Sequence, residues 1–102
     1  MKVLYEIYQT PVSTPYCFRS FAEAMESDFS QYDYNLKYCD EIDITNMAIG
    51  YVLDEIFVKH NRGDRPNGKT MRSLSVSDVV VLNEKPYYCD SYGWSEIPAE
   101  RW

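Results

Sequence analysis

The amino-acid sequence predicts a single compact α+β domain over residues 1–102, built from a small antiparallel or mixed sheet with two helices packed on it. Strand-like and helix-like stretches intermix along the chain, but without the strict strand–helix–strand repeat of a parallel sheet. Hydrophobic and charged contents of 45% and 25% are ordinary for a globular chain. No repeat, low-complexity tract or linker divides the 102 residues, which suffice for one modest core.

The N-terminal part of the chain is predicted to form a strand, a helix and a second strand. Residues 3–9 mix branched and aromatic residues with polar ones, as an opening strand does, and two prolines then end it. A helix is predicted within residues 20–32, because Ser20 and Glu23 have the spacing of a capping box and apolar residues recur at helical intervals. Residues 34–39 alternate in the manner of a strand.

A second helix is predicted over about residues 46–60. Thr45 is placed to cap it, and His60 at its end is expected to act as a cation near the helix C-terminus. The loop over residues 60–72 follows, because it is rich in turn-forming pairs such as Asn-Gly and Arg-Pro. The residues predicted for the apolar face of the helix are Ile49, Leu53, Ile56 and Phe57.

The most distinctive stretch of the sequence is RSLSVSDVVVL. Ser75 is spaced to cap a single helical turn together with Asp78. Residues 79–82 are then predicted to form a strand that is buried on both faces. Residues 83–86 are predicted to form a tight turn, and residues 87–94 the returning strand.

Charge is distributed unevenly along a chain whose net charge is −6. Residues 20–56 carry nine acidic residues and one basic residue, whereas residues 57–72 carry five basic residues and one acidic residue. Two surfaces of opposite sign could steer a charged partner. Equally, the basic loop could lie back on the acidic helix of the same molecule. The sequence leaves both alternatives open.

Tyrosines among the acidic residues suggest a binding surface for a basic partner. Carboxylates resemble phosphates in charge, and tyrosine supplies rigid amphipathic contact area, so such a face suits a nucleic-acid mimic or a protein that docks on a basic groove. The alternative is that these tyrosines only pack in the core and at its rim. The residues predicted for the acidic face are Glu23, Glu26, Asp28, Asp33, Tyr34, Asp40, Glu41 and Asp43.

The basic loop over residues 59–72 offers an alternative function, because its cations could contact nucleic-acid phosphates. The same loop contains GDRPNGKT, which formally matches a phosphate-binding pattern. A predicted helix precedes that motif in place of a buried strand, and Pro66 removes an amide, so nucleotide binding is disfavoured. The residues predicted for nucleic-acid contact are Arg62, Arg65, Lys69 and Arg72.

Catalysis, metals and membranes find little support in the sequence. One histidine and three cysteines (Cys17, Cys39 and Cys89) without a CxxC pair favour reduced thiols and no zinc site. The longest aliphatic run is far too short to span a bilayer, and the N-terminus lacks the apolar core of a signal peptide. We therefore expect a cytoplasmic protein that is not an enzyme, with no cofactor, no metal and no membrane partner.

Residues 53–97 resemble the YodL-like domain of Gram-positive bacteria, their phages and conjugative elements. The shared pattern is an acidic helix that ends in an Ile-Phe…Asn corner, a proline-containing loop, the string RSLSVSD, and a closing YYCDSYGW segment. His60 stands where the family commonly has an aromatic residue. The positions that carry the resemblance are Ile56, Phe57, Asn61, Pro66, Arg72, Ser73, Leu74, Ser75, Val76, Ser77, Asp78, Val79, Tyr87, Tyr88, Asp90, Gly93 and Trp94.

The resemblance implies a small cytoplasmic module of a mobile element that acts on host machinery, and it supplies no catalytic residues. Combined with the acidic face, it predicts a non-enzymatic inhibitor of a host nucleic-acid-handling or defence protein, of the anti-CRISPR or anti-restriction type. Alternatives are a nucleic-acid-binding module and a modulator of another host protein such as a cytoskeletal factor. The residues expected to have structural roles first are Ser73, Ser75, Asp78, Gly93 and Trp94.

Overall fold

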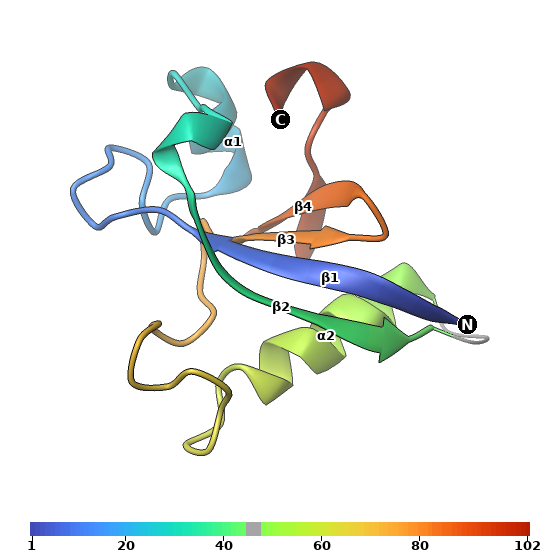
Figure 1. The fold of residues 1–102 in the computed structure, drawn as a ribbon. Coiled ribbons are helices and arrows are strands. Elements are labelled where there is room, and N and C mark those ends of the chain that lie inside the picture. The colour runs from blue at the N-terminus through green and yellow to red at the C-terminus, as the bar shows by residue number, and fades with distance from the viewer. Residues whose placement is uncertain (45–47) are drawn as a thin grey trace.

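A five-stranded antiparallel sheet forms the centre of the structure, a computed structural model that describes residues 1–44 and 48–102 (Figure 1). The strands lie in the order β2-β1-β3-β4-β5, so β2 and β5 form the two edges. The predicted α+β class is confirmed. In chain order the elements, with η for a 3-10 helix, are β1 (Lys2–Gln9), α1 (Phe21–Glu26), η1 (Gln31–Asp33), β2 (Asn35–Asp43), α2 (Ile49–Lys59), β3 (Val79–Leu82), β4 (Lys85–Cys89), β5 (Trp94–Glu96) and η2 (Ala99–Arg101).

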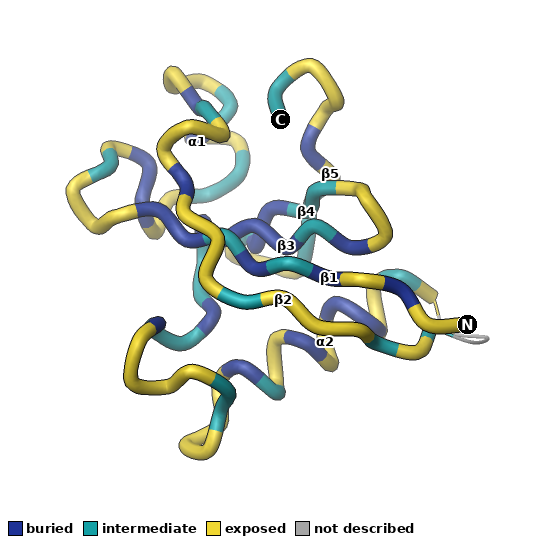
Figure 2. The backbone as a smooth tube through the Cα atoms, viewed as in Figure 1, coloured by how far each residue is buried: buried dark blue, intermediate teal, exposed yellow. Residues whose placement is uncertain are grey.

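Each face of the sheet is covered by a different layer. On one face lies α2, whose buried side chains are Val52, Leu53 and Ile56. The opposite face is covered by α1, η1 and the C-terminal segment (Figure 1). Strand β3 is almost entirely buried and β1 is buried at every second residue, whereas β2 is exposed along most of its length (Figure 2). The core therefore consists of two clusters separated by the sheet.

The alternation of side chains along the interior strands supplies both clusters. Tyr5 and Ile7 of β1 and Val80 of β3 join the cluster beneath α2. Their neighbours Tyr8 and Val79 join the opposite cluster. Successive side chains of a strand point to opposite faces, so an unbroken apolar run is what a strand covered on both faces requires. The predicted burial of this third strand is confirmed.

The first helix begins as predicted but ends early. Ser20 and Glu23 form the predicted capping box. The helix then stops after six residues and does not continue through the predicted range 20–32. The C-terminal segment supplies a physical reason: Arg101 donates to two backbone oxygens at the end of the helix, at 3.3 Å each. Carbonyl groups that a longer helix would have paired internally are satisfied there by a distant side chain.

The second helix also starts later than predicted. Ala48 is at its N-cap and makes no side-chain capping bond, and the predicted cap, Thr45, lies outside the described residues. Val52 takes the buried position that was predicted for Phe57. Phe57 is 36% exposed, and its ring packs edge-on against Trp94 with the centroids 6.5 Å apart.

A buried carboxylate, that of Asp78, fixes the turn before β3. Its Oδ2 accepts hydrogen bonds from the Ser75 backbone N–H at 2.9 Å and from Gln9 Nε2 at 3.0 Å, and its Oδ1 accepts from Arg72 Nη2 at 2.9 Å. The predicted pairing is present with its roles reversed. Asp78 caps the turn, which is not helical, while the Ser75 hydroxyl has no hydrogen-bond partner among the described residues. A carboxylate buried this fully needs several donors.

The returning segment 87–94 is not the single strand that was predicted. The tight turn has two central residues, Asn83 and Glu84, with φ of 50° and 70°, so β4 begins earlier than expected. After β4 a second turn follows, in which the Asp90 N–H donates to the Gly93 carbonyl at 2.9 Å. Gly93 has a φ of 80°, which glycine adopts without strain, and β5 then completes the sheet.

His60 is buried, so the prediction of a helix-terminal cation is wrong. Its Nε2 lies 3.1 Å from the Tyr5 hydroxyl oxygen, and its ring contacts that of Tyr38 with the centroids 4.9 Å apart. Burial, and secondarily the neighbouring charge of Lys59, lowers the pKa of His60 to about 4. The imidazole is therefore neutral near pH 7.

Replacing Asp78 by alanine should lower the free energy of unfolding by about 3 kcal/mol or more, because the substitution leaves the Arg72 guanidinium and two N–H donors without their acceptor. Urea unfolding followed by circular dichroism measures this loss. Asp64→Ala, at an exposed carboxylate, is the control and should cost less than about 0.5 kcal/mol. A loss below about 1 kcal/mol for Asp78→Ala would contradict the assigned role.

Acidification should destabilise the protein through His60. In the unfolded chain the His60 imidazole binds a proton near the ordinary histidine pKa of 6.5. In the folded protein it stays neutral until the pH approaches 4. The unfolded state therefore binds more protons between these values, and stability falls as the pH is lowered. Between about pH 7 and about pH 4.5 the expected loss is about 2 kcal/mol, and His60→Phe should abolish it.

Asp78 changes the stability with pH in the opposite direction to His60. The test is therefore the difference in the pH dependence of the free energy of unfolding between wild type and His60→Phe. Burial raises the pKa of Asp78 to about 6, although its hydrogen bonds and Arg72 favour the carboxylate. The stability that Asp78 contributes therefore falls as the pH rises from 3.8 to about 6. Because both proteins contain Asp78, this effect cancels. Urea unfolding curves with the same pH dependence in both proteins would refute a neutral, buried His60.

Candidate functional site

The acidic residues predicted to form one face lie in two groups. The first group lies on α1, on the loop after it and on η1, and consists of Glu23, Glu26, Asp28 and Asp33. The second group lies on the edge strand β2 and consists of Asp40, Glu41 and Asp43. The helix α1 covers the sheet face opposite α2, whereas the second group lies on the part of β2 that runs beside α2 (Figure 1). The structure does not join the two groups into a single face.

Tyr34, which was predicted on the acidic face, belongs to the core. It is 7% exposed, packs in the cluster beneath α1, and donates its hydroxyl to the Ser77 carbonyl at 2.6 Å. Burial raises the pKa of the Tyr34 hydroxyl above its ordinary value. The prediction of Tyr34 as a partner-binding residue is therefore wrong, because a side chain in this position cannot reach a partner.

Two of the four basic residues predicted for nucleic-acid contact are held by the fold. Arg72 is paired with Asp78, so it is not a free phosphate contact as predicted. Arg65 folds back toward backbone oxygens of its own loop at 3.5 Å. Arg62 and Lys69 are exposed. The loop therefore presents two exposed cations to solvent in place of the four that the sequence suggested, and one of them, Arg62, lies 3.6 Å from Asp64.

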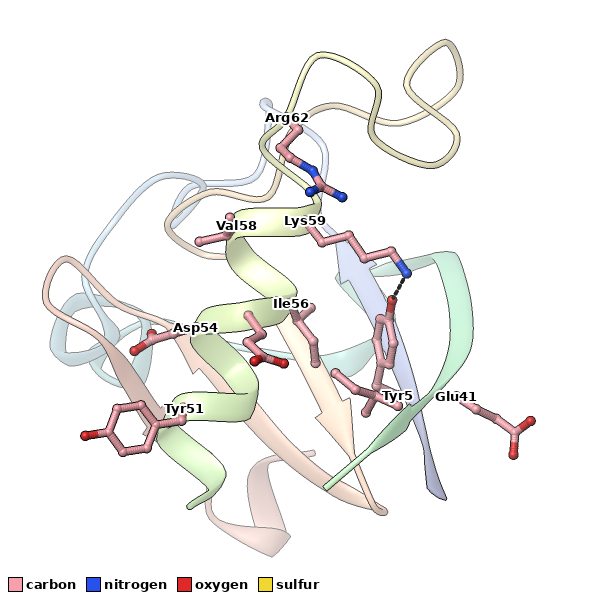
Figure 3. A pocket seen from close by; sticks show the side chains of 10 residues that line it. Tyr5, Glu41, Tyr51, Asp54, Ile56, Val58, Lys59 and Arg62 are labelled. Carbon is pink, nitrogen blue, oxygen red and sulfur yellow. Dashed lines mark hydrogen bonds between the residues drawn. The ribbon is translucent and has the colours of Figure 1, made fainter. Parts of the chain in front are cut away.

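A groove of about 550 Å³ lies between α2 and β2, which we call the α2–β2 groove (Figure 3). One wall is the solvent side of α2 and the other is the second half of β2. Ile56 and Tyr5 lie at its base, where Lys59 reaches across to within 3.5 Å of the Tyr5 hydroxyl oxygen (Figure 3). The lining residues are Tyr5, Glu41, Ile42, Tyr51, Asp54, Glu55, Ile56, Val58, Lys59 and Arg62.

The cations of the α2–β2 groove have carboxylate partners, whereas its carboxylates do not have cations. Lys59 lies 3.6 Å from Asp40, which is outside the lining, and Arg62 lies 3.6 Å from Asp64 in the loop. Within the described ranges 1–44 and 48–102, no ion pair involves the other charged residues of the lining. These residues are Glu41, Asp54 and Glu55. The groove is thus an acidic rim around an apolar base.

Asp40, which the sequence placed on the acidic face, helps to order the edge of this groove. Its carboxylate accepts from the Glu41 backbone N–H at 2.8 Å and from the Tyr38 hydroxyl at 3.2 Å. These two hydrogen bonds, the backbone bond foremost, hold the pKa of Asp40 below its ordinary value. Asp40 is therefore ionised over the physiological range and fixes the position of Lys59.

Sequence reasoning missed the contribution of α2 to this groove. None of Asp54, Glu55, Tyr51 and Val58 was among the residues predicted for a binding surface. The signal was present, because Tyr51 and Val58 are seven residues apart and so lie on one side of a helix. They form a second apolar stripe outside the buried one. Such a stripe on the polar side of a helix is typical of a contact surface.

A second hollow, of about 420 Å³, lies on the other side of α2, and we call it the signature cleft. Most of its lining carries the resemblance described above, including four residues that were predicted to be structural, Ser73, Ser75, Gly93 and Trp94. Asp54 lines both this cleft and the α2–β2 groove. The lining residues are Asp54, Phe57, Asn61, Ser73, Leu74, Ser75, Val76, Cys89, Asp90, Ser91, Gly93 and Trp94.

Hydrogen bonds from several elements fix the walls of the signature cleft. Asn61 Nδ2 donates to the carbonyl of Phe57 at 2.7 Å and to that of Leu74 at 3.0 Å, which ties α2 to the RSLSVSD loop. Trp94 Nε1 donates to Asp54 Oδ1 at 3.3 Å, which ties β5 to α2. The cleft is therefore a built feature of the fold and not a gap between mobile loops.

The structure offers few groups for metal or thiol chemistry. Within the described part of the chain, no three histidine, cysteine, aspartate or glutamate residues are grouped so that they could hold a metal ion. All three cysteines are free thiols; Cys39 is exposed, and Cys17 and Cys89 are buried. Burial raises the pKa of the Cys89 thiol to about 12. None of the described helices combines the length and apolar character needed to cross a bilayer.

Comparison with known proteins identifies the family. The model of the YodL-like domain family matches residues 4–99, so it includes the acidic first half, to which the resemblance noted in the sequence did not extend. No curated protein matches the chain, and no solved structure does. Because the family model covers nearly the whole chain, the protein belongs to the YodL-like domain family.

Proposed function

We propose that this protein is a non-catalytic interaction module that binds a basic segment of a partner protein in the α2–β2 groove. The observation that carries the proposal is the charge of the groove. Glu41, Asp54 and Glu55 surround an apolar base and have no ion-pair partner among the described residues. Basic side chains supply that countercharge, and their aliphatic stems cover the apolar base.

Apolar surface in the groove supports a protein partner. Tyr51 is 70% exposed and Val58 is 59% exposed, although both are large and lie on a helix. Together with Ile42 they provide contact area that is covered only when a partner binds. Buried aromatic and aliphatic anchors supply most of the affinity at interfaces, while charges at the rim increase the association rate and the selectivity.

The outer edge of β2 supports an extended partner segment. In the described residues, β2 pairs with β1 on one side and with no strand on the other. An open edge presents backbone N–H and C=O groups that an added strand can use. A segment in the groove lies beside this edge, so backbone hydrogen bonds and side-chain contacts can act together.

We propose a host protein with a basic surface as the partner, in the cytoplasm. Nucleic-acid-handling and defence proteins have such surfaces, because they bind phosphates. An acidic module that occupies such a surface competes with the nucleic acid, which is the mode of action of an anti-CRISPR or anti-restriction inhibitor. The mobile-element setting that the resemblance implies supports this class of target. A cytoskeletal factor with a basic segment fits the same groove chemistry.

Binding of nucleic acid by the basic loop has weaker support. Arg72 is occupied by Asp78, and Arg65 folds back on its own loop, so Arg62 and Lys69 remain. Two exposed cations on a chain of net charge −6 provide a small phosphate-neutralising surface. We therefore treat this function as an outcome of the test below.

The double charge reversal Glu41→Lys, Glu55→Lys should weaken partner binding about tenfold or more, because it replaces attraction at the groove rim by repulsion. The partner is first captured from a host lysate with the tagged protein and then purified for titration by calorimetry. Wild-type affinity should fall as salt is raised. The melting temperature of the double variant should stay within about 3 °C of wild type, since both positions are exposed.

The control reverses two carboxylates of the α1 group, Glu26→Lys and Asp28→Lys. It changes the net charge by the same amount on the opposite layer, so its affinity should stay within about twofold of wild type. Equal weakening by both double variants would reject the groove and favour a general charge effect. Capture of nucleic acid that is lost on nuclease treatment, with no protein partner, would reject the proposal in favour of the basic loop.

A further inference from the structure

The signature cleft combines negative charge with aromatic walls. Two of its lining residues, Asp54 and Asp90, are acidic, and its lining contains no basic residue. Phe57 and Trp94 form one wall, with ring centroids 6.5 Å apart and planes at 83°. A carboxylate beside an aromatic ring is the arrangement that attracts a cation, through charge and through the ring quadrupole. The cleft therefore favours a ligand that is cationic and partly apolar.

Several acceptors in this cleft have capacity to spare. Asp54 accepts one hydrogen bond through Oδ1, from Trp94, and in the described residues its Oδ2 accepts none. Asp90 is more fully used, because its Oδ1 accepts from the Phe21 and Ser91 backbone N–H groups at 3.0 and 2.8 Å. The available negative charge is thus concentrated at Asp54, next to the indole of Trp94.

The Ser75 side chain also borders the cleft. Its oxygen is buried, yet it has no hydrogen-bond partner among the described residues. Buried hydroxyl groups in folded proteins are normally paired, so an unpaired one calls for an explanation. Solvent does not reach this oxygen, so a ligand in the cleft does not reach it either, and the case for a ligand rests on Asp54 and the aromatic wall.

We propose that the signature cleft binds the side chain of an arginine from the partner segment. This deepens the proposed function and rests on it for the source of the arginine. Asp54 lines both hollows, so a segment that crosses the solvent side of α2 reaches the groove and the cleft together.

Arginine fits the cleft better than lysine does. A guanidinium is planar, stacks on aromatic rings and carries five N–H donors in a fixed fork. It can donate to Asp54 while its face lies on the indole of Trp94. The apolar side chains of Leu74 and Val76 are available for its methylene groups. An ammonium group is smaller and more strongly hydrated, so it gains less from the aromatic wall.

Nuclear magnetic resonance of the full chain tests this assignment without the partner. The protein has two tryptophans, so its ¹H–¹⁵N spectrum contains two indole N–H signals. Trp94 lines the cleft, and Trp102 packs against Tyr8 and Tyr34 in the opposite layer. Titration with N-acetyl-arginine amide should shift the Trp94 signal saturably, with half-saturation on the order of 10 mM, and leave the Trp102 signal in place.

Neutral and charged analogues identify the group that is recognised. N-acetyl-citrulline amide has nearly the same shape without the charge and should give less than about a fifth of the shift; N-acetyl-lysine amide should bind at least about threefold more weakly. Asp54→Asn should weaken arginine-amide binding about fivefold or more while keeping an acceptor for the Trp94 indole. Glu96→Gln, on the same strand as Trp94 but outside the cleft, should change it less than twofold.

The outcomes separate this inference from the proposed function. No saturable shift of Trp94, or an equal shift with citrulline amide, overturns the arginine site. Equal binding of lysine amide overturns the choice of guanidinium. If arginine amide does not bind at Trp94 but the Glu41 and Glu55 reversals still weaken partner binding, the proposed function stands without the arginine site. If arginine amide binds at Trp94 but those reversals have no effect, the cleft stands and the groove does not.

Discussion

Two consecutive residues, Ser77 and Asp78, connect the sheet to the turn before β3 and to the layer that contains α1. The carboxylate of Asp78 connects the end of β1, through Gln9, to Arg72 and to the turn that begins β3. Ser77 serves the opposite layer: its carbonyl accepts from the Tyr34 hydroxyl at 2.6 Å, and its Oγ accepts from the Phe18 N–H at 2.9 Å. The sheet and the α1 layer therefore meet at Ser77 and Asp78, which pair with Gln9, Phe18 and Tyr34 from distant segments.

This anchoring also determines what remains available for function. Because Arg72 is paired with Asp78 and Tyr34 is bonded to Ser77, neither is the free surface residue that the sequence suggested. The same turn places Ser75 and Val76 opposite Trp94, and so forms one wall of the signature cleft. The stability of the turn and the shape of the cleft thus depend on the same hydrogen bonds. The proposed recognition site lies on a small domain and would depend on this kind of shared support.

Local patterns predicted the elements well where local forces decide them. The capping box at Ser20 and the apolar run of β3 each depend on near neighbours in sequence. Predictions were wrong where residues distant in the sequence determine the local structure. Arg101 donates hydrogen bonds to the backbone carbonyls at the end of α1, and burial against Tyr5 keeps His60 neutral. The structure does not form the predicted single acidic face for the same reason. The count of charges along the chain does not indicate which carboxylates share a surface. Asp54 and Glu55 line the α2–β2 groove only because the fold places β2 beside α2.

The open edge of β2 has a further consequence for how this protein behaves in concentrated solution. An exposed strand of nine residues is normally a template for pairing with a second copy, the first step of self-association. Here the strand carries three carboxylates, Asp40, Glu41 and Asp43, against one ammonium group, that of Lys37. Pairing two copies along this edge doubles that negative charge within one ribbon, whereas pairing with a basic segment neutralises it. The charge that attracts the partner in the proposed function is thus also expected to disfavour pairing of this edge with a second copy.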